Sequence, residues 1–309
     1  MKILYMGTPE FAVAPLLALH EAGHDMVGVF TQPDRPKGRG MKMIPPPVKE
    51  KAQELGIPVY QPETLRGYAV KPLLEELKPD LIAVAAYGKL LPPYVLKAAG
   101  YGCINVHASL LPKYRGAAPI QRAIMAGERE TGVTIMYMTK ELDAGDVILS
   151  QATAIGAQET AGELTARLSE IGAGLLVRAV RMLWDGTATR TPQIDAQSTY
   201  AHLITREDAR IDWTRPAREV CDRIRAMLPS PGAFATCGEN VYKFADAVVT
   251  EGKGVPGTVL GISHGALVVS CGDDAVAIRQ IQAPGSRRMP VPDYARGHAL
   301  PEKFDEAGA

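Results

Sequence analysis

Short apolar runs alternate with longer segments of helical hydrophobic spacing over the first part of the chain, and Gly, Pro or Asp residues separate them. The runs that predict buried strands are residues 2–6, 25–31, 59–60, 80–86, 103–107, 132–138 and 147–155. The segments that predict helices are residues 11–22, 48–55, 69–77, 120–126 and 160–183. This alternating order is typical of an α/β fold, in which crossover helices cover both faces of a mostly parallel sheet.

The pattern changes after this part of the chain. Residues 187–205 lack apolar periodicity and are rich in Thr, Gln, Asp and Pro, which is typical of a linker. One predicted helix, 216–227, and several short β-rich runs between turn residues follow: 232–236, 241–244, 257–261, 266–270 and 275–282. That spacing indicates a small β-barrel. We therefore predict a Rossmann-like α/β domain at 1–188, a linker at 189–206 and a smaller C-terminal β-barrel domain at 207–309.

One stretch of the first domain, residues 32–47, is too polar and too rich in Pro and Gly to be a sheet element. At about 16 residues it also exceeds the usual connection between a strand and a helix. This stretch contains one acidic residue, Asp34, and four basic residues: Arg35, Lys37, Arg39 and Lys42. A solvated surface loop explains these charges. The functional alternative is a mobile basic arm that grips phosphates or a single-stranded nucleic-acid end.

The composition limits the classes of protein to which this chain can belong. The 309 residues are 46% hydrophobic and 22% charged, with 34 basic and 34 acidic residues, as in an ordinary globular protein long enough for two domains. The zero net charge argues against a broad basic face. Widely spaced cysteines suggest neither a disulfide framework nor a zinc site: Cys103, Cys221, Cys237 and Cys271. Because we find no signal-peptide core and no run of 18 apolar residues, we expect a cytoplasmic protein.

Three polar residues are expected at the carboxyl edge of the sheet, where α/β proteins bind ligands. Asn105 and His107 occupy positions i and i+2 of one strand and so point to the same face, and Asp143 follows the next strand. An Asn amide can donate to a developing oxyanion, and a His ring can exchange a proton near neutral pH. An Asp can fix the His tautomer and favour its charged form. Together these groups suit attack on a carbonyl carbon.

The nucleophile is expected to come from the substrate, for example an amine. Ser109 lies next to the turn at 109–112, and no GxSxG elbow exposes it. The turn after the first strand, residues 7–9, contains one glycine and therefore lacks the GxGxxG motif of a dinucleotide-binding site.

Each of these residues also has a structural interpretation when it is taken alone. His107 could be a satisfied residue at a strand end, Asn105 could tie down a loop, and Asp143 could cap a turn. Residues 113–115 could be a solvated turn. Tyr87 lies in a second loop expected at the same edge; packing is the simpler interpretation of its ring, and it is also a candidate cofactor-binding residue.

The segment NVHASLLPKYRGAAPIQRAI at 105–124, followed by ETGVTIMYM and LDAGDVI, closely resembles the folate-dependent formyltransferases. Asn105, His107 and Asp143 match the Asn, His and Asp of that family's active site. The turn at 109–112 matches the family's tetrahydrofolate-binding motif. The resemblance implies 10-formyltetrahydrofolate as a co-substrate and no metal. The residues it assigns to folate binding are Ser109, Leu110, Leu111 and Pro112.

Three further stretches are similar to the branch of this family that formylates methionyl initiator tRNA: GTPEFA at 7–12, TQPDRPKGRG at 31–40 and RIDW at 210–213. This resemblance covers nearly the whole chain. It implies that the basic loop contacts the acceptor end of the tRNA, and Arg39 matches the loop arginine implicated there. Arg35, Lys37 and Lys42 are further candidate tRNA contacts. The second domain is then an OB-like barrel, suited to irregular nucleic acid.

Two alternatives stay open at this point. An amino-sugar or other small-amine formyltransferase would use the same three polar residues without needing the long basic loop. A non-catalytic RNA-binding protein built on a degenerate α/β domain is the more distant alternative. We expect a monomer that binds tRNA and folate and does not associate with membranes.

Overall fold

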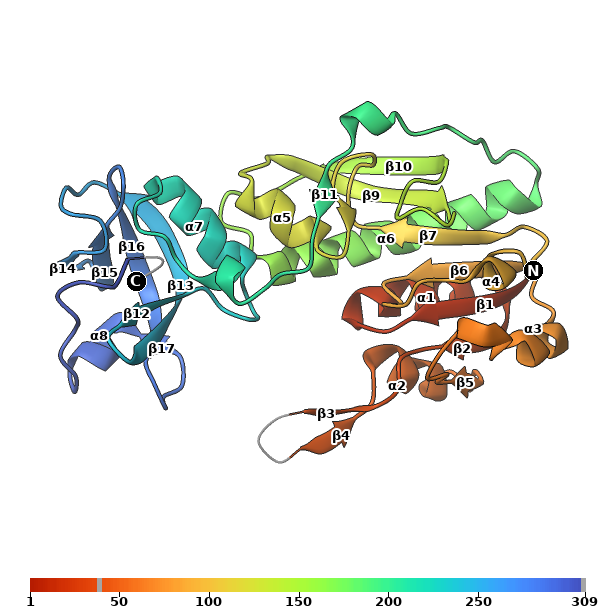
Figure 1. The fold of residues 1–309 in the computed structure, drawn as a ribbon, viewed down its shortest axis with the longest axis horizontal. Coiled ribbons are helices and arrows are strands. Elements are labelled where there is room, and N and C mark those ends of the chain that lie inside the picture. Colours follow the sequence, from red (N-terminus) through yellow and green to blue (C-terminus); the bar gives the residue numbers. More distant parts are fainter. Residues whose placement is uncertain (38–40, 307–309) are drawn as a thin grey trace. The chain divides into compact units, whose positions relative to one another are not determined.

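The computed structural model describes residues 1–37 and 41–306, and these form two compact units (Figure 1). The first unit comprises Met1–Gly116, Thr131–Thr153 and Thr165–Ala201. The second comprises Ala117–Glu130, Ala154–Leu164 and the chain from His202 onward. The domain bounds proposed from the sequence stay a prediction.

Seven of the described strands form the large sheet of the first unit, in the order β10-β9-β7-β6-β1-β2-β5. They are β1 (Lys2–Gly7), β2 (Asp25–Phe30), β5 (Val59–Tyr60), β6 (Leu81–Ala85), β7 (Cys103–His107), β9 (Glu130–Tyr137) and β10 (Val147–Ala154). Pairing is parallel from β5 through β2, β1 and β6 to β7, whereas β9 is antiparallel to β7. The predicted mostly parallel sheet is therefore confirmed.

Both faces of this sheet are covered. In β1, Ile3, Leu4, Tyr5 and Met6 are all fully buried, although successive side chains of a strand point to opposite faces. The helices of this part of the chain are α1 (Val13–Glu21), α2 (Pro47–Glu54), α3 (Lys71–Leu77), α4 (Pro93–Leu96) and α6 (Ala161–Trp184), with short 3₁₀ turns η1 (Glu10–Ala12), η2 (Arg66–Tyr68) and η3 (Asp195–Gln197). None of the helices in the described residues is long and apolar enough to cross a membrane.

Helix α6 begins with the capping box that its sequence predicts. The Thr160 backbone N–H donates to Glu163 Oε2 at 2.8 Å, and the Glu163 N–H donates back to Thr160 Oγ1 at 3.3 Å. These bonds satisfy two N–H groups that a helix start otherwise leaves without partners. The Thr160 N–H, and then the Thr160 hydroxyl, which also donates to Glu163 Oε2, lower the pKa of Glu163.

The prediction that residues 32–47 contain no sheet element was wrong. Strands β3 (Arg35–Lys37) and β4 (Lys42–Ile44) form an antiparallel two-stranded hairpin that projects from the main sheet (Figure 1). All of β4 is exposed. Hydrophobic patterning could not reveal such a ribbon, because its backbone hydrogen bonds form without burying either face.

The second unit is built on an antiparallel half-barrel. Its strands in the described residues are β12 (Phe234–Cys237), β13 (Asn240–Thr250), β14 (Val259–Ser263), β15 (Ala266–Ser270), β16 (Ala275–Gln282) and β17 (Met289–Pro290). The path runs β12-β13-β16-β15-β14, with β17 on β16. The helical elements are α5 (Pro119–Met125), η4 (Glu207–Ala209), α7 (Ala217–Ala226) and α8 (Val291–Ala295). This sheet confirms the prediction that a second domain, built mainly of β-strands, follows the α/β domain.

Aromatic residues fill the core of this half-barrel. Trp213 stacks on Phe304 with ring centroids 5.6 Å apart, and Phe244 meets Phe304 edge-on at 5.3 Å. Asp246 in β13 has a positive φ of 53°, and the β13–β16 pairing keeps the same register on both sides of it. The RIDW segment therefore contributes its tryptophan to the core of this unit.

A bidentate ion pair stabilises the second unit. Arg122 Nη1 and Nη2 donate to Asp208 Oδ1 and Oδ2 at 2.7 and 2.8 Å. These bonds, together with those from Thr205, lower the pKa of Asp208 to about 2. Because the folded-state pKa lies below the unfolded value, the stabilisation is present above about pH 4 and is lost as pH falls toward the folded-state pKa.

We predict that Asp208→Asn lowers the unfolding free energy of this unit by about 1 kcal/mol at pH 7, a value reduced from the pKa shift because water screens the partly exposed pair. The difference from wild type shrinks as pH falls below about 4. Urea titrations followed by Trp213 fluorescence in a Trp184→Phe background measure it. Asp246→Asn, which breaks the more exposed pair with Arg279, is the control and has the smaller effect. A difference that is constant between pH 7 and pH 3 contradicts the prediction.

Candidate active site

Strand β7 lies between β6 and β9 and carries two of the predicted site residues at positions i and i+2. Asn105 is 8% exposed and His107 is 5% exposed. Within the described residues the Asn105 side-chain amide makes no hydrogen bond, so it is available to a ligand. The structure therefore does not support the alternative in which the Asn105 side chain only holds a loop in place.

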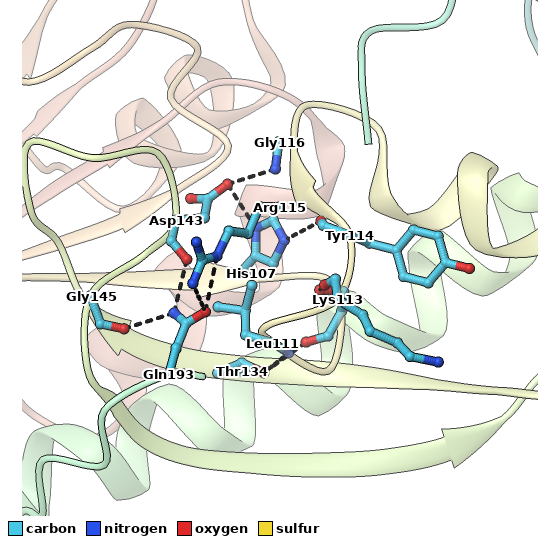
Figure 2. A network of polar contacts seen from close by, with 11 residues as sticks. His107, Leu111, Lys113, Tyr114, Arg115, Gly116, Thr134, Asp143, Gly145 and Gln193 are labelled. Carbon is cyan, nitrogen blue, oxygen red and sulfur yellow. Dashed lines mark hydrogen bonds and ion pairs between the residues drawn. The ribbon is translucent and has the colours of Figure 1, made fainter. Parts of the chain in front are cut away.

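The His107 ring is held at both nitrogens. Its Nε2 lies 2.9 Å from the carbonyl oxygen of Tyr114, and because a carbonyl oxygen only accepts, Nε2 carries the hydrogen. Its Nδ1 faces Asp143 Oδ2 at 3.7 Å, an ion-pair distance (Figure 2). Nδ1 is therefore the atom at which the neutral ring can take up a proton.

Asp143 itself is fixed by the backbone. Its Oδ2 accepts a hydrogen bond from the Gly116 N–H at 2.8 Å, and its side chain is 12% exposed. The residue lies in the loop between β9 and β10 with a φ of +48°, a conformation that L-residues seldom adopt. The structure thus brings together His107 from one strand end and Asp143 from a neighbouring loop, as the sequence pattern predicted.

The turn at 109–112 is held by a residue that sequence reasoning missed. Thr134 Oγ1 donates to the Ser109 carbonyl at 2.7 Å and accepts from the Leu111 N–H at 3.2 Å. Ser109 Oγ donates to the Lys113 carbonyl at 2.6 Å, and Ser109 is fully buried. The Ser109 hydroxyl thus donates its hydrogen to the backbone, which agrees with the expectation that Ser109 is not the nucleophile. Thr134 pairs with His107 across β7 and β9, and no local motif marks it.

Two apolar side chains of this turn, Leu110 and Leu111, are both partly exposed. Leu90, in the loop after β6, is 80% exposed. Apolar side chains at neighbouring strand ends offer a surface on which a flat heteroaromatic ring can pack. These residues are compatible with a folate, and their assignment to it stays a prediction.

Tyr87 is 2% exposed and packs in the core of the first unit, so the packing interpretation of its ring holds. Its hydroxyl is buried without a partner in the described part of the chain. Burial, and to a smaller extent Tyr94, raise the pKa of Tyr87 to about 12, so the hydroxyl remains a proton donor. The Tyr87 carbonyl accepts from Thr8 Oγ1 at 3.0 Å and from Gln32 Nε2 at 3.1 Å.

The predicted nucleic-acid contacts gather on the β3–β4 hairpin. Arg35 and Lys42 are exposed on its two strands. Lys37 lies on β3, but its side chain is outside the described part of the structure, as is the whole of Arg39. The structure therefore places two of the four predicted tRNA-binding side chains at one exposed ribbon.

A polar cluster anchors the base of this hairpin. Lys49 Nζ donates to both carboxylate oxygens of Asp34 and to Gln61 Oε1, each at 2.8 Å. Gln61 Nε2 donates to Asp34 Oδ1 at 2.7 Å and to the Gln32 carbonyl at 2.8 Å. The hydrogen bonds from Lys49, then those from Gln61, lower the pKa of Asp34. Asp34, counted above only as a charge opposing the basic residues, is a structural anchor.

The interpretation of residues 113–115 as a solvated turn was wrong for Arg115, which is 3% exposed. Its guanidinium donates to Gln193 Oε1, and Gln193 Nε2 in turn donates to the carbonyls of Asp143 and Gly145 (Figure 2). Neither Arg115 nor Gln193 has a local sequence signal that connects it with the site, because 78 residues separate them.

Comparison with known proteins identifies the class. The chain matches the formyl transferase family over residues 1–180 and the formyl transferase C-terminal domain over residues 203–299. It belongs to the folate-dependent formyltransferases. The solved structure of HypX from Aquifex aeolicus in complex with tetrahydrofolic acid has a similar fold, with a TM-score of 0.64 and 21% identity over 95% of this chain and 46% of that one.

Within this class the chain belongs to the methionyl-tRNA formyltransferases. It is 48% identical over 302 residues to the methionyl-tRNA formyltransferase of Alkaliphilus oremlandii, covering 97% of both chains. It is 47% identical over 305 residues to that of Pelotomaculum thermopropionicum, covering 98% of this chain and 97% of the relative.

We predict that Lys49→Met makes the β3–β4 hairpin more accessible, because it removes every hydrogen bond that Lys49 donates to Asp34 and Gln61. Limited digestion with trypsin, followed by mass spectrometry, should show cleavage within residues 35–42 several times faster than in wild type. Lys51→Met is the matched control, because Lys51 lies on the same helix and pairs only with Glu54 among the described contacts. Equal cleavage rates in the two variants would show that the cluster does not hold the hairpin.

Proposed function

We propose that this chain transfers the formyl group of 10-formyltetrahydrofolate to the α-amino group of methionine esterified to initiator tRNA, giving formylmethionyl-tRNA for translation initiation. Full-length similarity to methionyl-tRNA formyltransferases supports the reaction and the acceptor. The observation that carries the chemistry is a His ring between a carbonyl and a carboxylate, on the same strand face as an Asn105 amide that makes no hydrogen bond to the described residues.

The reaction forms one bond and breaks one. The amine nitrogen bonds to the formyl carbon, and the bond from that carbon to N10 of the folate breaks. The amine loses one proton and N10 gains one, so no oxidant or further reactant is needed. The protein must manage this proton and stabilise negative charge that develops on the formyl oxygen.

His107 suits the proton transfer and Asn105 the charge. Because the Nε2 hydrogen of His107 is directed to Tyr114, a proton enters and leaves at Nδ1, where Asp143 stabilises the imidazolium. The Asn105 amide lies on the same face of β7 as His107, at the position from which it can donate to the formyl oxygen. Asp143 is the partner of the charged ring and does not itself bond to substrate.

The donor and the acceptor have separate candidate surfaces. The turn at 109–112, held by Thr134, and the loop that contains Tyr87 are the candidate folate-binding elements. The basic hairpin with Arg35, Lys37, Arg39 and Lys42 is the candidate tRNA contact, where phosphate charges would be neutralised. Binding at the hairpin is thus separable from chemistry at β7.

The function is tested by transfer of labelled formyl from 10-formyltetrahydrofolate to methionyl initiator tRNA. The assay runs beside a His107→Ala variant and an unacylated tRNA. Transfer that needs both the imidazole and the esterified methionine supports the proposal. Transfer to small amines, with none to RNA, would replace it with a small-amine formyltransferase.

We predict that Asn105→Ala lowers kcat about a hundredfold to a thousandfold, because one oxyanion donor is lost. Single-turnover formylation at saturating substrates measures the effect. Asn240→Ala is the matched control, since Asn240 is exposed on β13. Near-normal turnover of Asn105→Ala would remove Asn105 from the mechanism.

We predict that Arg39→Ala raises KM for the tRNA and leaves KM for the folate unchanged. Loss of one phosphate contact should reduce the slope of log KM for tRNA against log salt concentration by about 0.9 at most. Arg178→Ala, a substitution of an exposed arginine on α6, controls for the change in net charge. An equal loss of affinity for both substrates would indicate misfolding and contradict the assignment.

A further inference from the structure

We propose that Gln193 is a positioning residue for Asp143, and that residues 193–201, which we call the strap, hold the His107–Asp143 pair in its reactive geometry. This inference rests on the proposed role of Asp143. The strap falls within the stretch that the sequence pattern describes only as a linker.

The Gln193 side chain bridges the loop that carries Asp143. Its Nε2 donates to the carbonyl oxygens of Asp143 and Gly145, both at 2.8 Å (Figure 2). That loop has little freedom elsewhere: Asp143 has a φ of +48°, and a Cβ at Gly145 would lie 1.8 Å from the Tyr137 carbonyl oxygen. Gln193 therefore fixes the backbone on both sides of Ala144, and with it the direction of the Asp143 carboxylate.

Arg115 decides which way the Gln193 amide points. Its Nε and Nη2 donate to Gln193 Oε1 at 3.1 and 2.8 Å. A guanidinium only donates, so the amide oxygen must face Arg115 and the amide nitrogen must face the two carbonyls. Arg115 Nη2 also donates to Asp195 Oδ1 at 2.8 Å, so the strap supplies two partners to this buried cation.

The strap also holds the backbone segment that contacts both His107 and Asp143. The N–H groups of Tyr114 and Arg115 donate to Thr199 Oγ1 and to the Thr199 carbonyl, each at 2.8 Å. Strand β8 (Arg115–Gly116) also pairs with β11 (Tyr200–Ala201) in parallel register. β8 and the residue before it provide the Tyr114 carbonyl that orients His107 and the Gly116 N–H that orients Asp143.

The fit between β8 and the strap requires glycine at one position. Gly116 has a φ of 120°, and a Cβ there would lie 2.7 Å from the Ala201 carbonyl oxygen. Ala201 of the strap therefore lies so close to Gly116, whose N–H binds Asp143, that a side chain at position 116 would not fit. Both ends of the strap, Gln193 and Ala201, act on the geometry of the same carboxylate.

The substitution Gln193→Glu distinguishes a role of Gln193 in positioning Asp143 from a role in folding. The new carboxylate can still accept from Arg115, but it has no N–H to donate to the carbonyls of Asp143 and Gly145 and repels them. Since small displacements of a catalytic group cost up to about a hundredfold in rate, we expect kcat to fall about tenfold to a hundredfold. KM for tRNA and folate should stay within about twofold of wild type, because no substrate contact changes.

The control is Gln197→Glu, which makes the same charge change at an exposed side chain that takes no part in the contacts described above, which Gln193, Asp195, Thr199 and β11 make. It should leave kcat, both KM values and the thermal unfolding midpoint unchanged. Equal kcat values for Gln193→Glu and Gln197→Glu would overturn the proposal. So would a lowered unfolding midpoint with kcat and both KM values changed together, which is the pattern of a purely structural role. Gln193→Leu, which introduces no charge, repeats the measurement if the Glu variant fails to fold.

A double variant distinguishes this proposal from the assigned role of Asp143. If Gln193 acts through Asp143, Asp143→Asn combined with Gln193→Glu should be no slower than Asp143→Asn alone. Additive losses would overturn the positioning role while leaving the role of Asp143 intact. Full activity of Asp143→Asn would contradict the proposed mechanism itself, and with it the positioning role that depends on it.

Discussion

The geometry of the site depends on the hydrogen bond from His107 Nε2 to the Tyr114 carbonyl. That bond orients the ring so that Nδ1 faces Asp143, and it places the hydrogen of the neutral ring on Nε2. The Gly116 N–H, two residues further along the chain, holds the Asp143 carboxylate in place. One short stretch of backbone thus orients both members of the pair, and whatever holds that stretch also holds the reactive geometry.

The candidate catalytic residues and the candidate tRNA-binding residues lie on different elements. The catalytic candidates lie on buried strand ends and their loops, where rigid packing limits movement. The basic side chains of Arg35 and Lys42 lie on an exposed ribbon whose base is held by hydrogen bonds among Lys49, Asp34 and Gln61. Buried strand-end residues together with an exposed basic hairpin are compatible with a methionyl-tRNA substrate, in which one small reacting amine lies at the end of a large nucleic acid.

Much of the fold could be predicted from the sequence because the main strands are buried on both faces. The runs at 103–107 and 266–270 are strands with the predicted bounds, because the hydrophobic effect acts on every position of a strand that is buried on both faces. The run at 275–282 is also a strand with the predicted bounds, although its Arg279 is exposed. The β3–β4 hairpin was missed because it buries almost nothing. The spacing of Asn105 and His107 also followed from the sequence, because the two residues share one strand and its two-residue repeat.

The sequence alone determined the order of the elements, the strand face that carries Asn105 and His107, and the position of Asp143 in a loop after the next strand of the sheet. Only the tertiary structure decided which backbone groups meet these side chains. Thr134, Arg115 and Gln193 are ordinary polar residues in their local contexts, and the partners named above lie 23 to 80 residues away in the chain. Their role arises from hydrogen bonds between distant segments, and such bonds leave no periodic pattern in the sequence because each is set by how the segments pack.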